Sequence, residues 1–395
     1  MNAPAGYTLG GYGEMIAPTQ RMHGYLAALR KAIRPGSIVL DIGAGTGIFS
    51  LLACKLGAGH VHSVEPDDAV LLGHTFAADN GFAGRITFHQ QLSSRVSLPT
   101  QADVIVSDLR GIIPLFQHHI PAIIDARQRL LAPGGVLIPM RDVLYGSMIE
   151  SPELYARYQE PWLKNEFGLN LTAAHPMAVN SWKKARINPQ QLLTAPQVWC
   201  TLDYRTIDAP DVKGELSWTV QRAGVAHGLG LWFDAELADG IGFSNAPGEP
   251  DLVYGQAFFP LQHEVALEIG DRLSIVLSAN LVGANYIFSW QTSVQTQRGT
   301  KASFRQSTFL GEVVSLAKMK RTEVHFAPSP TQEMEIDRQC LALADGLTCL
   351  GDMARALTEQ FPQRFARSQD ALAYVANLFE AYAPATAPAL IVKGG

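Results

Sequence analysis

A glycine-rich stretch near the N-terminus has the residue types that bind a nucleotide-containing ligand. In the segment VLDIGAGTGIFS, three glycines follow an acid at every second position: Asp41, Gly43, Gly45 and Gly47. Glycines at the turn from a strand to a helix let the backbone approach a ligand and point free N–H groups outward. With Glu65 at the end of the next predicted strand, the turn fits a ligand whose ribose hydroxyls bind a carboxylate.

Three interpretations of this turn are open. The dinucleotide fingerprint spaces its glycines as G-x-G-x-x-G, whereas this chain has G-x-G-x-G with an acid two residues ahead. Asp41 would serve a pyrophosphate poorly, but it would tolerate a sulfonium ligand that carries an ammonium group. The pattern therefore favours S-adenosylmethionine as the cofactor over a dinucleotide. A strand–turn–helix packing motif without any ligand is the third interpretation.

The segments around the turn alternate short apolar runs with helical patterns. Five runs between Ser37 and Met140 predict strands: SIVLDI, HVHSVEP, RITFHQ, ADVIVSD and GGVLIPM. This alternation is typical of an α/β fold with a doubly wound parallel sheet. A helix from about Thr19 to Ala32 is predicted to lie against the sheet.

The residue pattern changes after the last strand predicted for this sheet. From about Arg141 to Ser307, β-branched and aromatic stretches are broken by Gly, Pro and Asn, which predicts an antiparallel barrel or sandwich. A third unit, helical by its period, follows the segment APSPTQ. The predicted domains are therefore a Rossmann-like domain in residues 1–140, a β-barrel in 141–310 and a small helical domain in 311–385.

The composition excludes several classes of protein. A net charge of -5 gives no general attraction to nucleic acid or to an anionic membrane. The N-terminal residues lack a signal-peptide pattern, and no apolar run approaches the roughly 20 residues that span a bilayer, so we expect a cytoplasmic protein. The cysteines form no CxxC pair or zinc-like cluster, which predicts reduced thiols and no structural metal. They are Cys54, Cys200, Cys340 and Cys349.

The chain resembles the protein arginine methyltransferases from about Gly10 to Ser293. The similar segments are VLDIGAGTGIFSLLACKLGAGHVHSVEP, SDLRG, LAPGGVLIP and GFSNAPGEPDLVYGQAFF. The resemblance implies a Rossmann-type methyltransferase domain, a β-barrel domain and a substrate site between them. It also implies a homodimer formed through an arm inserted in the barrel, for which residues 154–181 and 192–214 are the candidate regions.

The same resemblance implies roles for residues of the cofactor site. Asp41 and the three glycines would line the methionine part of S-adenosylmethionine, and Glu65 would hold the ribose. Arg21 stands where the family has an arginine for the cofactor carboxylate. Ser94 falls where the family usually has an acid near the adenine.

The loop that binds the substrate in this family is changed here. A guanidinium has five donors and stays charged, so two carboxylates are needed to fix it and expose a nucleophilic nitrogen. In the loop SDLRGIIPLFQHH, Asp108 takes the first glutamate position, the uncharged Gln117 takes the second, and Arg110 adds a cation. The family's Thr-His-Trp loop is replaced as well, by Leu252, Val253 and Tyr254. Arginine specificity is therefore not carried over.

Three residues of this loop are predicted to serve catalysis. Asp108 is the candidate base or orienting acceptor, and a helix N-cap is its alternative role. Gln117 can direct hydrogen bonds to an amide, an imidazole or a carboxyl group. Arg110 suits an anionic group and thus carboxylate O-methylation or an acidic substrate, unless it pairs with a surface acid. His118 and His119 are expected to face solvent or to pack.

The C-terminal segment resembles the small winged-helix protein of pyrroloquinoline-quinone biosynthesis, whose relatives bind leader peptides. The similar features are a helix ending in ADG at Ala344, a second helix with Met353 and Leu357, and a third ending near Phe379. The resemblance implies that a peptide adds to a sheet edge, for which TEVHFA at Thr322 is the predicted strand. Residues 331–382 hold eight acids against four arginines, which disfavours DNA binding.

These features together predict an S-adenosylmethionine-dependent methyltransferase that modifies a side chain or carboxylate of a peptide or protein, such as a ribosomally made peptide natural product. The C-terminal unit would bind a leader segment of that substrate. Two alternatives stay open. One is a small-molecule methyltransferase whose third unit is structural, and the other is a non-catalytic scaffold that keeps the fold. Neither a nucleic acid nor a membrane is an expected partner.

Overall fold

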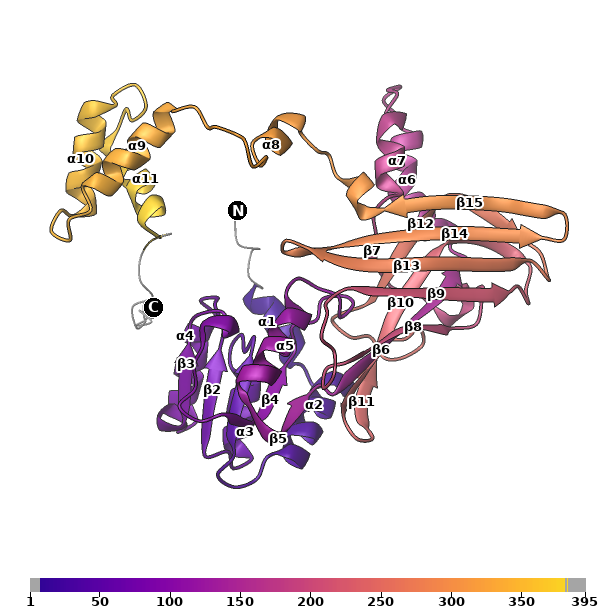
Figure 1. The fold of residues 1–395 in the computed structure, drawn as a ribbon, viewed down its shortest axis with the longest axis horizontal. Helices are drawn as coiled ribbons and strands as arrows, with labels where there is room; N and C mark the ends of the chain where they lie inside the picture. Colours follow the sequence, from indigo (N-terminus) through magenta and orange to yellow (C-terminus); the bar gives the residue numbers. More distant parts are fainter. Residues whose placement is uncertain (1–7, 381, 383–395) are drawn as a thin grey trace. The chain divides into compact units, whose positions relative to one another are not determined.

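The computed structural model describes residues 8–380 and 382, and the chain divides into two compact units (Figure 1). The first unit comprises residues 1–313 and the second residues 314–395. The first unit contains both of the sheet regions that the sequence predicts, and the second contains the predicted helical segment. None of the described helices is long and apolar enough to cross a membrane.

The N-terminal part of the first unit is the predicted parallel sheet. Its strands are β1 (Ile38–Ile42), β2 (His60–Val64), β3 (Ile86–His89), β4 (Ala102–Ser107) and β5 (Leu131–Ile138). They pair in the order β3-β2-β1-β4-β5, every pair parallel. The central strands are apolar almost throughout because both faces of a parallel sheet are covered. The strand order changes direction between β1 and β4, and such sheets bind ligands at the carboxyl ends of the strands beside that point.

Five helices accompany this sheet: α1 (Leu9–Ile16), α2 (Gln20–Ala32), α3 (Ile48–Lys55), α4 (Val70–Asp79) and α5 (His119–Arg129). The predicted helix from Thr19 to Ala32 is α2, and Thr19 is its N-cap residue. Helix α3 begins directly after the glycine-rich turn, with Gly47 in the left-handed conformation as its N-cap. The turn and α3 therefore follow the carboxyl end of β1.

The rest of the first unit is antiparallel and runs from Arg141 to Ser307, as predicted. One sheet has the order β7-β12-β10-β6-β8, with β11 paired to β10, and the other has the order β15-β14-β13-β9. The strands are β6 (Arg141–Ile149), β7 (Lys183–Ala185), β8 (Gln197–Asp203), β9 (Val212–Thr219), β10 (Gly224–Ala238), β11 (Ile241–Ser244), β12 (Gln256–Leu267), β13 (Arg272–Val282), β14 (Asn285–Thr296) and β15 (Gly299–Ser307). This is the barrel-like domain that the sequence predicts.

Helix α2 connects the parallel sheet to the antiparallel strands. Buried side chains of both parts belong to one continuous hydrophobic core. A Cβ atom on Gly24 of α2 would lie 3.2 Å from Leu237 and 3.4 Å from the carbonyl oxygen of Gly242, so a larger residue would push the helix away. On the same helix, the Tyr25 hydroxyl donates to the Ser107 carbonyl at the end of β4. Helix α2 is thus fixed against both β4 and β11.

Two helices project from the antiparallel strands, α6 (Pro152–Leu163) and α7 (His175–Ala178) (Figure 1). Helix α6 begins at Pro152, and the Ser151 side chain caps it by accepting from the Leu154 N–H. Between α6 and α7 the apolar side chains of Phe167 and Leu169 are 81% and 60% exposed. This projection lies in the first of the two candidate arm regions.

The described part of the second unit is helical. Its helices are α8 (Leu316–Lys320), α9 (Gln332–Ala342), α10 (Leu350–Gln360) and α11 (Ser368–Glu380). The last three enclose a separate core that includes Ile336, Cys340, Leu357 and Val375. Figure 1 shows these three helices grouped together.

The strand predicted at Thr322 is wrong. Residues 321–325 form turns, and no strand occurs in residues 314–380 of this unit. An alternating segment becomes a strand only when another strand pairs with it, and this part of the chain supplies none. Pro328 and Pro330, which follow directly, also remove backbone donors. The wing of the predicted winged helix is therefore absent from the described residues of this unit.

Candidate functional site

The glycine-rich turn lies at the carboxyl end of β1, next to β4. Gly43, Gly45 and Gly47 have φ angles of 71°, 55° and 81°, a region that favours glycine. A Cβ atom on Gly43 would overlap the Leu109 side chain. One on Gly45 would come within 2.6 Å of the Tyr12 ring of α1. The backbone conformation favours glycine at all three positions, and close neighbours leave no room for a side chain at Gly43 and Gly45. The turn at the switch point of the sheet therefore depends on these glycines.

Asp41 is fully buried at the end of β1. The Ser50 hydroxyl donates to its Oδ2 over 2.7 Å, whereas Oδ1 has no hydrogen-bond partner in the described part of the chain. Burial raises the pKa of Asp41 to about 7. A buried acceptor without a donor is costly, and a ligand that brings an ammonium group would satisfy it.

Glu65 follows β2 and is nearly buried. Its Oε2 accepts from the Gly45 N–H over 2.8 Å, and its Oε1 accepts from the Asp67 N–H over 2.9 Å. Burial raises the pKa of this carboxyl above its ordinary value. Each carboxylate oxygen has a second lone pair, so the side chain is held by the turn and can still accept from two hydroxyls.

The donor and acceptor set at this edge fits S-adenosylmethionine. The unpartnered Asp41 oxygen suits its ammonium group, and the fixed Glu65 carboxylate suits its ribose hydroxyls. Ser94 lies in a short 3-10 helix, Ser93–Arg95, with an exposed side chain, and nothing in the structure ties it to an adenine. Among the described residues, no group of three or more His, Cys, Asp or Glu is placed to hold a metal ion.

Cofactor binding should depend on pH through Asp41. With a pKa of about 7, Asp41 is largely protonated below pH 7, and a cationic ligand must displace that proton. The affinity for S-adenosylmethionine should therefore be constant only above pH 7 and fall about tenfold per pH unit below it. Calorimetry at pH 6 in buffers of different ionisation enthalpy should show the released proton. Asp41→Asn should remove both the pH dependence and the proton release.

Arg21, predicted to bind the cofactor carboxylate, is nearly buried and surrounded by acceptors of the chain itself. Its Nε donates to Asp108 Oδ2 over 2.7 Å and to the Tyr254 hydroxyl over 2.9 Å, and its Nη2 lies 2.5 Å from Asp108 Oδ2. Its Nη1 donates to the Met15 carbonyl. A cofactor carboxylate would have to share this guanidinium with Asp108.

Asp108 does not have the environment of a general base. Its Oδ2 accepts from Arg21 and from the Tyr254 hydroxyl, and its Oδ1 accepts from Arg110 Nη1 over 3.0 Å. Burial would raise the pKa of this carboxyl, but the two guanidinium groups outweigh burial and lower it to about 2. The helix N-cap alternative also fails, because α5 begins at His119 with His118 as its N-cap residue.

Arg110 forms an ion pair, but with a buried acid rather than a surface acid. Its Nε and Nη2 donate to the two oxygens of Asp142 on β6, each over 2.7 Å. Its Nη1 donates to the Tyr25 hydroxyl over 2.7 Å as well as to Asp108. Asp142 also accepts from the Tyr204 hydroxyl over 2.5 Å. Four of the five N–H donors of Arg110 thus have partners, and its side chain has no measurable exposure, so an anionic substrate does not reach it. Arg110 connects the loop after β4 to the antiparallel strands.

Gln117 differs from the charged residues of this loop, Asp108 and Arg110, because its side chain has no partner in the described part of the chain. It is half-buried, no hydrogen bond of its side chain occurs in the structure, and its φ of 42° is the only positive value of a non-glycine residue among those described. His118 next to it is exposed. His119 is buried, and its Nε2 lies 3.0 Å from the Tyr204 hydroxyl. Of the two histidines, one faces solvent and the other packs, as expected.

Three members of this buried network are not among the residues singled out from the sequence: Tyr25, Asp142 and Tyr204. Tyr254 is named there only as a replacement in the Thr-His-Trp loop, without a role. A signal for Asp142 exists in the sequence. It shares its side of β6 with Leu144 and Met148, which are buried at every second position. An acid at an inward position of an apolar strand predicts a buried partner.

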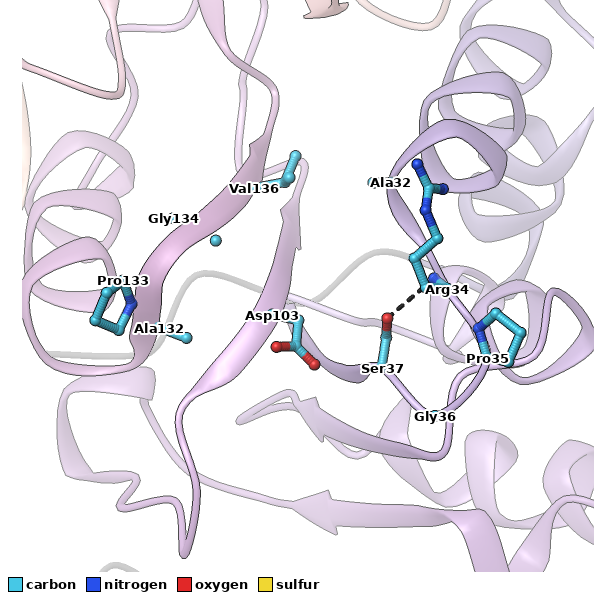
Figure 2. A pocket seen from close by; sticks show the side chains of 11 residues that line it. Ala32, Arg34, Pro35, Gly36, Ser37, Asp103, Ala132, Pro133, Gly134 and Val136 are labelled. Carbon is cyan, nitrogen blue, oxygen red and sulfur yellow. Dashed lines mark hydrogen bonds between the residues drawn. The ribbon is translucent and has the colours of Figure 1, made fainter.

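A cavity of about 480 Å³ lies elsewhere on the parallel sheet (Figure 2). It is lined by residues at the amino ends of the strands, among them Ser37, Asp103 and Gly134. Ser37 accepts from the Arg34 N–H and Asp103 accepts from the Ile38 N–H, so both polar side chains already have backbone partners. The glycine-rich turn lies at the opposite ends of these strands, and this cavity is therefore separate from the candidate cofactor site.

Comparisons with known proteins bear on the same two regions. A family model described as the arginine methyltransferase oligomerization subdomain matches residues 141–285. A model of the ribosomal protein L11 methyltransferase matches residues 18–139. The boundary between these matches coincides with the change from the parallel to the antiparallel sheet.

Relatives of this chain carry the same kind of name. Protein arginine N-methyltransferase 2 of Homo sapiens is 30% identical over 299 residues, which cover 70% of this chain and 69% of the relative. The protein of that name from Dictyostelium discoideum is 29% identical over 232 residues, covering 56% and 45%. Protein arginine N-methyltransferase 6 of Arabidopsis thaliana, described as probable, is 27% identical, covering 58% and 55%. The chain thus spans about half the length of the last two relatives.

Solved structures show the same fold. The Trypanosoma brucei PRMT1 enzyme-prozyme heterotetrameric complex with AdoHcy contains a chain that matches with a TM-score of 0.70 at 20% identity, covering 76% of this chain and 98% of that one. Protein arginine methyltransferase 10 of Arabidopsis thaliana, in an open conformation, matches with a TM-score of 0.67 at 21% identity, covering 76% and 97%. The second unit of this chain lies outside the matched family models.

Proposed function

The chain belongs to the protein arginine methyltransferase family, and from this membership we propose that it transfers a methyl group from S-adenosylmethionine to a side chain of a protein or peptide. The observation that carries the proposal is the carboxyl edge beside β1. There a glycine-rich turn, an unpartnered buried oxygen of Asp41 and a fixed Glu65 carboxylate lie together. This set matches the cationic and ribose parts of one ligand.

In the proposed reaction the cofactor supplies an electrophilic methyl group, and the residues of the chain mainly bind and align. Glu65 and the glycine-rich turn would hold the ribose, and Asp41 would hold the ammonium group. Arg21, kept in place by Asp108 and Tyr254, would take the carboxylate. Displacement at a methyl carbon needs a straight approach of the acceptor, so alignment supplies most of the rate.

Transfer of a radioactive methyl group tests this function. The full-length protein would be incubated with labelled S-adenosylmethionine and mixed peptide pools, and the label in the peptides would be counted. Asp41→Ala should lose at least about tenfold in labelling at limiting cofactor, because it removes a charged partner of the ligand. Failure to label any peptide under conditions where the cofactor binds would contradict the proposal.

A non-catalytic scaffold is the second candidate, and one observation favours it. The Arg21 guanidinium already has Asp108, Tyr254 and the Met15 carbonyl as partners, so the arrangement is complete without a ligand. A scaffold would bind neither the cofactor nor a substrate tightly, but it would bind a catalytic partner. Absence of both cofactor binding and turnover, together with stimulation of a partner enzyme, would support it.

We also propose that the chain forms a homodimer through the projection of α6 and α7. The family model over this region is an oligomerization subdomain, and the projection carries the exposed side chains of Phe167 and Leu169. Apolar side chains of this size on a projecting segment are typical of an interface. Sedimentation of Phe167→Asp, compared with the unchanged chain, tests this part.

The second unit is proposed to recognise a segment of the substrate peptide, as a leader-binding unit would. It has its own hydrophobic core, and its Leu347 side chain is 91% exposed. The peptide would therefore bind to exposed apolar side chains of this unit and would not add as a strand to a sheet. A ribosomally made precursor peptide and a cytoplasmic location remain parts of this proposal. The structure holds all four cysteines as free thiols, which suits a reducing compartment.

Removal of the second unit should affect the substrate and not the cofactor. A chain ending at Val313 retains the whole first compact unit. Its KM for a peptide substrate should rise at least about tenfold, with a similar kcat, because only a binding contact is lost. Its Kd for S-adenosylmethionine should not change. An unaltered KM would show that the second unit is structural.

A further inference from the structure

The charged groups around the loop after β4 leave no carboxylate for a cationic acceptor. Arg21 and Arg110 are balanced by Asp108 and Asp142, and the oxygens of both acids accept from these guanidinium groups. S-adenosylmethionine would add one net positive charge. The Asp41 and Glu65 carboxylates would be used by the ammonium group and the ribose of that cofactor. A guanidinium or ammonium acceptor would then find no unpaired acid around this loop, and a buried cation without a partner costs several kcal/mol when water is excluded.

The same geometry leaves neither carboxylate free to act as a general base. The Asp108 carboxylate accepts from Arg21, Arg110 and Tyr254, and Asp142 accepts from Arg110 and Tyr204. A carboxamide or a hydroxyl must lose a proton to become a good nucleophile, so neither suits this site. A carboxylate needs no base, but a buried carboxylate needs an accessible cationic donor. The Arg110 side chain has no measurable exposure, and its charge is already paired with Asp142 and Asp108.

Gln117 is a half-buried polar side chain of this loop that makes no hydrogen bond to the described residues, whereas the next residue, His118, is exposed. It precedes the buried His119 at the start of α5, and the buried Ile113 and Leu115 fix the loop before it. Its amide has one carbonyl acceptor and two N–H donors. Its left-handed backbone is unusual for glutamine, and such outliers concentrate at functional sites.

We propose that the methyl acceptor is the neutral imidazole of a histidine side chain in the substrate, held by Gln117. The inference rests on the proposed methyl transfer and names its acceptor. A neutral imidazole brings no charge, and one ring nitrogen has a free lone pair without the help of a base. The other ring nitrogen carries a hydrogen that the Gln117 carbonyl can accept, which fixes the tautomer.

The step balances without any further reactant. The lone pair of the unprotonated ring nitrogen forms the new bond to the methyl carbon, and the bond from that carbon to sulfur breaks. The electron pair of the broken bond stays on sulfur, which becomes a neutral thioether. The methylated ring is then a cation, and it returns to neutrality by releasing the hydrogen of its other nitrogen to water.

Four peptide pools test the acceptor. They share randomised flanks and differ at the central residue, which is His, Arg, Glu or Asn, with none of these four in the flanks. Full-length protein and saturating labelled S-adenosylmethionine should label the His pool at least about tenfold more than each other pool. The rate should rise with pH through about 6.5, the ordinary pKa of histidine, and then level off. Saturating cofactor removes the separate pH effect of Asp41 on binding.

Variants of the loop separate recognition by Gln117 from a structural role. Gln117→Ala should raise the KM for the His pool about tenfold or more, as expected for loss of a directed hydrogen bond. Gln117→Glu can still accept from the ring nitrogen, so it should keep transfer to histidine. Asparagine adopts the left-handed backbone readily, so Gln117→Asn keeps the conformation of the loop and shortens only the side chain. A raised KM in this variant would show that the loss of affinity in Gln117→Ala does not come from a change of the backbone. The exposed neighbour provides the control, and His118→Ala should leave the rate unchanged.

The other results would overturn the inference. Preferential label in the Arg pool, or label in the Glu pool that mild base releases as methanol, would place the acceptor in another class while the proposed methyl transfer would stand. Preferential label in the Asn pool, or a rate of labelling that is independent of pH between 5 and 8, would also exclude a neutral histidine as the acceptor and leave the proposed methyl transfer standing. Label in no pool, with the cofactor bound, would contradict both the inference and the proposed function.

Discussion

Replacement of Asp142 by alanine should lower the free energy of unfolding by about 3–5 kcal/mol. Asp142 accepts from both Nε and Nη2 of Arg110, and neither side chain has measurable exposure. The variant leaves a buried guanidinium with only Tyr25 and Asp108 as partners. Urea unfolding of the full-length chain, followed through the first unit, measures the loss.

Two comparisons make this prediction specific. Asp125 pairs with Arg129 on the surface of α5, with side chains 34% and 38% exposed, so Asp125→Ala should cost no more than about 0.5 kcal/mol. Replacement of Arg110 by methionine together with Asp142 by leucine removes both charges, and it should recover most of the lost stability. If Asp142→Ala lowered the free energy of unfolding by less than about 1 kcal/mol, the Arg110–Asp142 pair would not be what holds the loop after β4 against β6.

Glu65→Gln should weaken S-adenosylmethionine binding about 10- to 100-fold, because charge-assisted hydrogen bonds contribute about 1.5–3 kcal/mol each. Both oxygens of Glu65 accept from backbone N–H groups, of Gly45 and of Asp67. A glutamine has only one acceptor oxygen, so its NH₂ group would face one of these donors and loosen the turn. The exposed Glu249 supplies a matched control, and Glu249→Gln should bind as the unchanged chain does. Equal Kd values for both variants would remove Glu65 from the cofactor site.

Much of the fold is predictable because its signals are local. The five strands of the parallel sheet and helix α2 follow from the sequence pattern, and the structure differs from the prediction by only a few residues at their ends. The glycine-rich turn is equally local, since its three glycines adopt the positive φ values that only this residue accommodates easily.

The candidate site is less predictable because its groups come from distant segments. Arg110 and Asp142 are separated by 32 residues, and Arg21 and Tyr254 by 233, so no local pattern pairs them. From the sequence, Asp108 is a candidate base or orienting acceptor, and Arg110 is a cation for an anionic group or the partner of a surface acid. In the structure, Asp108 pairs with Arg21 and Arg110, and Arg110 pairs with the buried Asp142. The strand predicted at Thr322 failed for a related reason, since strand formation depends on a partner elsewhere in the chain.

Calorimetric titration of the full-length protein with S-adenosylmethionine, with NAD as the comparison ligand, tests the central claim most directly. We expect one site for S-adenosylmethionine, with an affinity that Glu65→Gln lowers, and no measurable binding of NAD. Binding of NAD in preference to S-adenosylmethionine would contradict the assignment of the glycine-rich turn. Binding of neither would contradict the proposed methyl transfer and leave the scaffold as the function to pursue.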